Sequence, residues 1–400
     1  MDKTHTTGDL KLVRKLNKSI VFNFIKDHGP VSRAEIAKQT SLNKATVSSL
    51  VEELIHENFV REIGTGKSSG GRRPVLLLFN GDAGSVIGVD LGVHYISILL
   101  TNLNCEVLWS KETAISPELT PDEIIDTLVS LIQQAVQLAP QTRHGILGIG
   151  VGVPGIVDYK NGSVLLAPNL NWRRTPLKRI LEEHTKLPVY LDNEANMAAL
   201  GEKMFGAGNG YDHMAYISSG IGIGVGLILN DELYRGAVGY AGEMGHMTIE
   251  RNGLKCPCGN RGCWEMYASE KAFYMRMKED YRLSDVSRTS FYDYVNEANR
   301  GNDRVIANLN ETGEYLGIGV ANIVNTFNPN LVVIGNTLAA GGKWIFNPIE
   351  KTLATRALHF STEHVKVVRS QLGDRACAIG SVSSILQNLF AVSDRPSPLP

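Results

Sequence analysis

The apolar positions of the first sixty residues recur at the spacing of short amphipathic helices. A first helix is predicted over residues 12–25 and ends at Gly29-Pro30, since proline cannot continue it. A serine with a glutamate three residues later starts a second helix over 32–37. Asn43 caps a third helix over 43–56. Two short helices joined by a tight turn predict a helix-turn-helix, whose second helix enters the DNA major groove.

Two apolar runs that follow these helices have the length and composition of β-strands. Residues 59–63 and 75–79 flank the loop GTGKSSGGRRP, so they predict a hairpin wing with a basic tip. The alternative is a three-helix protein-interaction module with a solvated basic loop. If the winged helix is correct, the residues expected to contact DNA are Arg33, Asn43, Lys44, Thr46, Ser48, Ser49, Lys67, Ser68, Ser69, Arg72 and Arg73.

Beyond residue 85 the pattern changes to alternating strands and helices. Apolar runs bounded by glycine predict buried strands, and an amphipathic run after Thr120 predicts a helix to about Leu138. The glycine-bounded strands near Gly88 recur in outline at 217–229. Glycine-rich turns let backbone amides approach a phosphate, but close strand packing explains them as often. The sequence therefore predicts an α/β body with two similar halves.

The length of the chain, 400 residues, exceeds that of a usual single domain. We predict a winged helix-turn-helix DNA-binding domain over 1–80, a first α/β lobe over 81–195, a second α/β lobe over 196–392 and a disordered tail over 393–400. Residues 1–80 carry thirteen Lys and Arg and eight Asp and Glu, a net charge of +5, whereas the whole chain is at −1. A basic module on a mildly acidic body is typical of a nucleic-acid reader.

The composition, with 43% hydrophobic and 20% charged residues, is that of a soluble globular protein. The sequence contains no run of about eighteen apolar residues and no apolar signal-peptide core. We therefore expect a cytoplasmic protein that does not enter a membrane. Five cysteines, an odd number, fit a reducing compartment better than a disulfide framework, and Cys105 and Cys377 are predicted to be ordinary buried residues.

Three of the five cysteines lie within eight residues, shortly after a histidine. Cys256, Cys258, Cys263 and His246 can fill a tetrahedral zinc shell, and the glycines of CPCGNRGC supply the tight turns. Four protein ligands leave no position for water, so we predict a structural and not a catalytic Zn²⁺. The alternative is three reduced cysteines in a loop.

Several motifs of the chain together resemble those of the ROK family of repressors and sugar kinases. Besides the winged helix, they are GVPGIVD at 152–158, APNLNW at 167–172, DNEANMAALGE at 192–202, AGEMGHM at 241–247 and CPCGNRGCWE at 256–265. The resemblance covers almost the whole chain and implies a two-lobed body of the actin and hexokinase type, with sugar bound in the cleft. LNKATVSS, GKSSGGRRP, GEMGHMTI and GCWEMYASEKA further resemble the repressors of xylose genes in Gram-positive bacteria.

The resemblance also implies a set of sugar contacts. By motif these are Gly155, Asn193, Glu194, Glu243, His246 and Glu265. Carboxylates accept hydrogen bonds from sugar hydroxyls and an asparagine amide donates them, so the set suits a sugar that leaves water. His246 would bind zinc through one ring nitrogen and a hydroxyl through the other. The alternative for any single glutamate is a solvated surface charge.

Three departures from the family's kinases argue against phosphoryl transfer. Where kinases carry Asp-x-Gly-Gly-Thr-Lys, residues 90–95 read DLGVHY, which puts the branched Val93 where backbone should approach phosphate. Glu194 stands in place of the kinases' catalytic Asp, and 333–337 lacks their Gly-Gly pair. We therefore predict no catalytic residue.

These observations predict a sugar-responsive transcriptional repressor and not an enzyme. We expect a homodimer on a palindromic double-stranded operator, released when xylose, or else glucose, binds the cleft. The alternatives are an ATP-dependent sugar kinase with a DNA-binding arm, a repressor that responds to another sugar, and a repressor controlled by a transporter protein.

Overall fold

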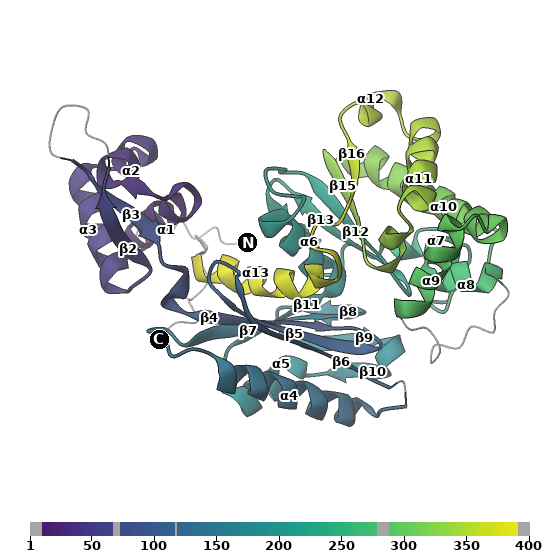
Figure 1. Cartoon of the computed structure of the whole chain (residues 1–400), viewed down its shortest axis with the longest axis horizontal. Helices are drawn as coiled ribbons and strands as arrows, with labels where there is room; N and C mark the ends of the chain where they lie inside the picture. Colours follow the sequence, from purple (N-terminus) through teal and green to yellow (C-terminus); the bar gives the residue numbers. More distant parts are fainter. Residues whose placement is uncertain (1–9, 67–72, 117, 278–287, 391–400) are drawn as a thin grey trace, which may run out of the picture.

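The chain folds into three parts, a small N-terminal unit and two lobes that are each built on a five-stranded sheet (Figure 1). The computed structural model describes residues 10–66, 73–116, 118–277 and 288–390. The tail predicted at 393–400 lies outside these residues. Among the described helices, none combines the length and the apolar character needed to cross a membrane.

The N-terminal unit contains three helices and a small antiparallel sheet of order β1-β3-β2. Ser32 and Glu35 form the predicted capping box of α2, and Asn43 accepts a hydrogen bond from the Thr46 backbone N–H at the start of α3. Strand β1 was not predicted, because two residues are too short to show a pattern. The elements are α1 (Leu10–His28), β1 (Val31–Ser32), α2 (Arg33–Thr40), α3 (Lys44–His56), β2 (Val60–Thr65) and β3 (Val75–Phe79).

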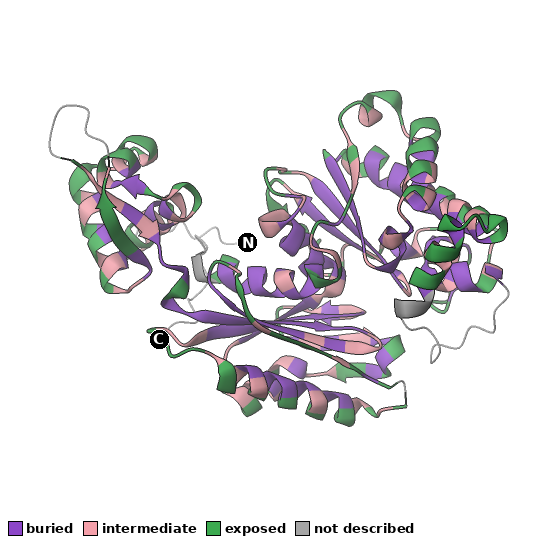
Figure 2. Cartoon of the chain, viewed as in Figure 1, coloured by how far each residue is buried: buried purple, intermediate pink, exposed green. Residues whose placement is uncertain are grey.

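The first lobe is built on a sheet of order β11-β7-β4-β5-β6, in which β4, β7 and β11 are parallel. Helices α4 and α5 cover one face and α13 covers the other (Figure 1), so β4 is buried along its whole length (Figure 2). A small sheet of order β10-β9-β8 completes the lobe. The elements are β4 (Ser85–Leu91), β5 (Tyr95–Asn102), β6 (Val107–Ala114), α4 (Pro121–Leu138), β7 (Ile146–Val153), β8 (Ile156–Asp158), β9 (Ser163–Ala167), β10 (Trp172–Thr175), α5 (Leu177–Thr185) and β11 (Val189–Asn193).

The second lobe is built on a sheet of order β14-β13-β12-β15-β16, in which β12, β15 and β16 are parallel. Helix α6 packs on one face of this sheet, and α7, α8, α10 and α11 contribute to the hydrophobic core on the other face. The elements are α6 (Glu194–Phe205), β12 (Met214–Ser219), β13 (Ile223–Leu229), β14 (Glu232–Leu233), the short 3-10 helix η3 (Met244–His246), α7 (Glu265–Ala268), α8 (Glu270–Met277), α9 (Arg288–Asn299), α10 (Asp303–Phe327), β15 (Leu331–Gly335), α11 (Lys343–Arg356), α12 (His359–Thr362), β16 (Lys366–Arg369) and α13 (Ala376–Phe390).

The two large sheets share one topology. In each, a three-stranded antiparallel meander is followed by two parallel strands that add to the free edge of its first strand. The glycine-bounded repeat that the sequence predicted at 217–229 corresponds to β12 and β13, the counterparts of β4 and β5. The structure confirms the predicted α/β class with two similar halves.

Helix α13 packs on the first sheet at backbone contact distance. A Cβ added to Gly150 would lie 2.0 Å from the Ser381 carbonyl oxygen, and one added to Gly88 would lie 2.2 Å from the Ala378 carbonyl oxygen. Any larger residue at either position would separate the helix from the sheet. By number α13 falls in the range predicted as the second lobe, 196–392, but the chain returns across the molecule and the helix completes the first lobe.

The N-terminal unit and the first lobe share one hydrophobic cluster. Buried residues of α1 and α3 belong to the same cluster as Val382 and Leu386 of α13. Beside it, the His144 ring stacks on Phe59 with ring centroids 4.2 Å apart, and His144 Nε2 lies 2.7 Å from the Glu57 carbonyl oxygen. The N-terminal unit therefore packs directly on α13 and on the segment that precedes β7.

Candidate functional site

A cleft of about 1140 Å³ is lined by residues of both lobes. Some come from the ends of β7 and β11 and the start of α6, and others from the segment after β14 and from α7. All six residues predicted to contact sugar line this cleft, namely Gly155, Asn193, Glu194, Glu243, His246 and Glu265. The fold thus brings them together from positions more than one hundred residues apart, while sugar contact itself stays a prediction.

Asn193 is held in place by the backbone around it. Its side-chain amide donates to the Gly155 carbonyl oxygen at 2.8 Å, and its Oδ1 accepts from the Ala195 backbone N–H at 2.8 Å as the N-cap of α6. Gly155 has a φ of 98°, and a Cβ there would lie 2.2 Å from the Leu166 carbonyl oxygen, so only glycine fits. One amide hydrogen of Asn193 remains for a ligand.

Glu243, His246 and Glu265 form the wall contributed by the second lobe. His246 Nδ1 lies 3.3 Å from Glu265 Oε1. Glu243 keeps accessible surface because it faces the cleft, but the surrounding protein desolvates its carboxyl and raises its pKa, while His246 lowers that pKa and Glu265 raises it. Two carboxylates in one wall suit a ligand with several hydroxyl donors.

The cleft also has polar lining residues that sequence reasoning missed. His94, Arg173, Lys271, Asn336 and Thr337 all line it. They come from four separate segments of the chain, and three of these segments, DLGVHY, GCWEMYASEKA and residues 333–337, had been singled out in the sequence without these side chains being assigned to the cleft. Those segments were a signal that the sequence offered, but only the fold shows that these side chains reach one site.

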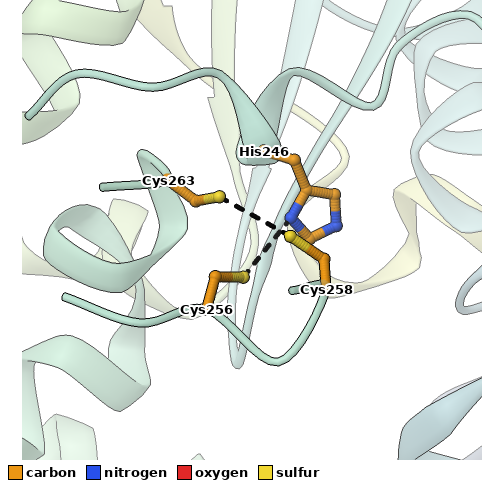
Figure 3. A group of neighbouring side chains, drawn as sticks. All are labelled: His246, Cys256, Cys258 and Cys263. Atoms are coloured by element: carbon orange, nitrogen blue, oxygen red, sulfur yellow. Dashed lines mark hydrogen bonds between the residues drawn. The ribbon is translucent and has the colours of Figure 1, made fainter. Parts of the chain in front are cut away.

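The predicted zinc ligands converge. Cys256, Cys258, Cys263 and His246 point toward one another (Figure 3), and their ligand atoms all lie within 4.8 Å of one another. The Sγ atoms of Cys258 and Cys263 are 3.7 Å apart, and Cys256 Sγ is 3.7 Å from His246 Nδ1. Two sulfurs on a tetrahedral zinc, each at about 2.3 Å, would be roughly 3.8 Å apart. The group can therefore hold a metal ion.

The three thiols differ in acidity, because burial raises the pKa of Cys256 and that of Cys263 whereas the pKa of Cys258 is lowered. Burial raises the pKa of the Cys258 thiol, but hydrogen bonds from the Asn260 backbone N–H and from the Cys256 and Cys263 thiols outweigh it, so this pKa is lowered. A thiolate is the form that binds a metal. Because Nδ1 of His246 faces the sulfurs, its other ring nitrogen remains for a ligand in the cleft.

The loop at 90–95 is covered by one of its own side chains. Tyr95 donates a hydrogen bond from its hydroxyl to Asp90 Oδ2 at 2.9 Å. Its ring lies against Gly92, where an added Cβ would be 2.3 Å from a ring carbon. The ring therefore fills the space beside the Gly92 backbone. Sequence reasoning named Val93 as the obstacle; Val93 lines the cleft, but Tyr95 is the residue packed on the loop.

Of the residues predicted to contact DNA, those within the described part of the chain lie at the start of α2, at the N-terminus of α3 and along it, and shortly before β3. In the structure Asn43, Lys44, Ser49 and Arg73 are exposed, and Arg33, Thr46 and Ser48 are partly exposed. The remaining four, Lys67, Ser68, Ser69 and Arg72, lie outside the described residues.

Some of these side chains already have partners within the protein. Arg33 forms an ion pair with Glu62 at 3.0 Å, and Ser49 accepts a hydrogen bond from Arg14 at 3.3 Å. Asn43 uses its side-chain oxygen to cap α3. DNA would have to compete for Arg33 and Ser49, so these contacts stay predictions.

Comparison with known proteins identifies both parts of the chain. Residues 86–388 match the ROK family, and residues 21–64 match the IclR helix-turn-helix domain. A putative xylose repressor of Caldicellulosiruptor sp. (strain Rt8B.4) is 45% identical over 396 residues, which cover 97% of this chain and 99% of that protein. The xylose repressor of Bacillus subtilis (strain 168) is 41% identical over 386 residues, which cover 96% and 98%.

A solved structure matches both parts together. The crystal structure of a ROK family transcriptional regulator, a homolog of the E. coli MLC protein, has a TM-score of 0.80 and 27% sequence identity. The match covers 94% of this chain and 97% of that one. It therefore includes the N-terminal unit as well as the two lobes.

Proposed function

Because the chain belongs to the ROK family and carries an N-terminal helix-turn-helix, we propose that it represses xylose-utilisation genes and leaves its operator when xylose binds the cleft. The family resemblance and the fold predicted from the sequence motifs are confirmed. The chain is a sugar-responsive transcriptional repressor and not a sugar kinase.

One observation carries the proposal: a DNA-binding unit is packed on a two-lobed body whose cleft gathers three glutamates. Glu194, Glu243 and Glu265 offer acceptors for sugar hydroxyls, and Asn193 and His246 offer donors. The Tyr95 ring over the loop at 90–95 disfavours a nucleotide phosphate there. The same cleft would therefore bind a sugar and release it unchanged.

We infer that the metal of the cysteine group is zinc. Three thiolates and one imidazole are a ligand set that Zn²⁺ prefers, and four protein ligands suit a structural site. Bound there, zinc would hold the segment from His246 to Glu265, so that both residues keep their place in the cleft wall. The metal ion itself would not contact the sugar, because all six proposed sugar contacts are residues of the protein.

We propose that the repressor works as a homodimer on a palindromic operator. A pair of symmetry-related winged helices reads two half-sites separated by multiples of one DNA turn. Sugar binding would alter the angle between the lobes and thereby the separation of the two winged helices. An effector that binds one site typically changes the affinity of a second site by about 5-fold to 150-fold, and here the second site is the one that binds operator DNA.

An operator mobility-shift titration tests the proposal. With the full-length protein, xylose should release operator DNA, and glucose should either compete with xylose or have a weaker effect. Release by neither sugar would contradict the proposal. Release by a transporter protein in the absence of sugar would favour a partner-controlled repressor, and turnover of ATP at about 1 per second or faster with any sugar would favour a kinase.

A further inference from the structure

An ion pair joins the two lobes directly behind the sugar cleft. Arg235 follows β14 in the second lobe, and Asp192 lies in β11 of the first lobe. Arg235 Nε donates to Asp192 Oδ2 at 2.8 Å. The Asp192 side chain is only 4% exposed and that of Arg235 is 28% exposed. A carboxylate so deeply buried depends on its partner, because losing that partner leaves an uncompensated charge.

The other oxygen of Asp192 holds the strand end that carries the predicted sugar contacts. Asp192 Oδ1 accepts from the Asn193 backbone N–H at 2.8 Å and from the Asn196 side-chain amide at 2.9 Å. Asn193 in turn donates to the Gly155 carbonyl oxygen. A continuous set of hydrogen bonds thus runs from Arg235 through Asp192 to the first-lobe wall of the cleft.

The Arg235 end is tied to the second-lobe wall. The Ala241 backbone N–H donates to the Arg235 carbonyl oxygen at 3.2 Å, which closes the segment 235–241 just before Glu243. The Arg235 guanidinium also lies over the ring of Tyr159 in the first lobe, with Cζ 4.8 Å from the ring centroid. A Cβ added to Gly239 would lie 2.9 Å from the same ring. The segment that leads to Glu243 is therefore packed on the opposite lobe.

We propose that Arg235 is an inter-lobe positioning residue that sets the separation of the two walls of the sugar cleft, an inference that rests on the sugar-binding function proposed above. Arg235 and Asp192 do not line the cleft, so they act through Asn193 and Glu243 and not by contact with sugar. A guanidinium suits this place, because it pairs with a carboxylate and stacks on an aromatic ring at the same time.

The test compares the full-length wild-type protein with Arg235→Met, Arg235→Lys and a matched control, Arg179→Met. Arg179 pairs with Glu183 at 3.7 Å on α5, with both side chains largely exposed. Calorimetric titration with xylose should show affinity reduced by about ten-fold or more in Arg235→Met, partly restored in Arg235→Lys and unchanged in Arg179→Met. Operator affinity without sugar should change by less than about two-fold, because the winged helix packs on α13 and not on Arg235.

Wild-type xylose affinity in Arg235→Met would overturn the inference. If Arg235→Met loses metal or folds poorly, the double variant Arg235→Met with Asp192→Asn removes the buried charge that lacks a partner. We expect this double variant to fold, to keep its metal and still to bind xylose weakly. If the double variant binds xylose with wild-type affinity, the pair of Arg235 and Asp192 contributes only to stability, and the inference is overturned.

A sugar-independent measurement separates this inference from the proposed function. If the wild-type protein binds neither xylose nor glucose, the proposed function fails. Hydrogen exchange still tests the ion pair between Arg235 and Asp192 that joins the two lobes. Backbone amides of residues 190–196 should exchange about ten-fold faster in Arg235→Met than in Arg179→Met, because the strand end loses its support. Equal exchange in the two variants would refute the positioning role.

Discussion

Glu265 stands at the boundary between the metal group and the cleft. Its Oε1 accepts from the Cys256 thiol at 3.1 Å and lies 3.3 Å from His246 Nδ1, and the residue also lines the cleft. The metal ligands and the proposed sugar contacts therefore belong to one cluster of side chains. A single substitution should therefore affect sugar binding without affecting metal binding only if it leaves the metal-ligating Sγ and Nδ1 atoms in place.

Replacing Glu265 by Gln provides one such variant. The amide keeps the size of the side chain but loses the charge, so a hydrogen bond from a sugar hydroxyl to a carboxylate becomes a weaker neutral one. We expect xylose affinity to fall by roughly 10-fold to 100-fold in calorimetric titrations, while metal analysis still finds one ion per chain. Unchanged xylose affinity would remove Glu265 from the proposed contacts.

Replacing Cys258 by Ser should remove the metal. Cys258 is exposed and has a lowered pKa, and serine is a poor zinc ligand. Metal analysis of the purified variant should find less than about half an ion per chain, and xylose affinity should fall because His246 and Glu265 lose their support. Cys105→Ser is the control, since Cys105 lies outside the metal group and should leave the metal content unchanged.

Among the elements, α3 of the winged helix begins at a capped N-terminus, with Asn43 as the N-cap residue. Asn43 has the extended backbone of an N-cap, and its Oδ1 accepts from the Thr46 N–H at 2.7 Å. The same side chain was predicted to contact DNA. The capping bond explains why asparagine stands here without any DNA contact, so the two roles need separate tests.

Two substitutions at position 43 distinguish capping from DNA contact. Asn43→Ala should lower the free energy of unfolding of the winged helix by about 1 kcal/mol, whereas Asn43→Asp should preserve it, because aspartate caps as well as asparagine. Asn43→Asp should nevertheless weaken operator binding through repulsion from phosphate. Urea unfolding and mobility-shift titrations measure the two effects, and full operator affinity in Asn43→Asp would exclude a position near the DNA backbone.

For the whole molecule, the junction between the winged helix and the first lobe determines how a sugar signal can reach DNA. Helix α13 begins directly after a short 3-10 helix at 373–375 and packs against the winged helix. The close approach at Gly88 and Gly150 fixes it to the first sheet. The first lobe and the winged helix are thus expected to move together. His144 adds a second connection through its stacking on Phe59.

Replacing His144 by Ala should weaken this coupling without affecting either binding site. The change removes the ring stacked on Phe59 and the contact with the Glu57 carbonyl oxygen. We expect unchanged xylose affinity but a fall of about three-fold or more in the factor by which xylose weakens operator binding. Operator titrations with and without xylose measure this factor. His184→Ala, on the outer helix α5, is the control, and a normal factor in His144→Ala would show that the junction does not carry the signal.

The sequence by itself determined the local elements and the metal group, because their information is local. The helices of the winged unit, their caps and the Cys256, Cys258 and Cys263 loop follow from spacing over a few residues. The same holds for the repeated glycine-bounded strands of the two lobes. Family motifs added the six residues that line one wall or the other of the cleft, although their contact with sugar is untested.

Only the tertiary structure decided how distant segments meet. The pairing of Arg235 with Asp192 and the return of α13 to the first sheet join residues that no local pattern relates. Such contacts depend on how two sheets, their helices and the loops between them pack in space, and a charge or a ring has no preferred partner until that packing exists. The sequence therefore identified the groups that can bind metal and sugar, and the fold determined which side chains support them.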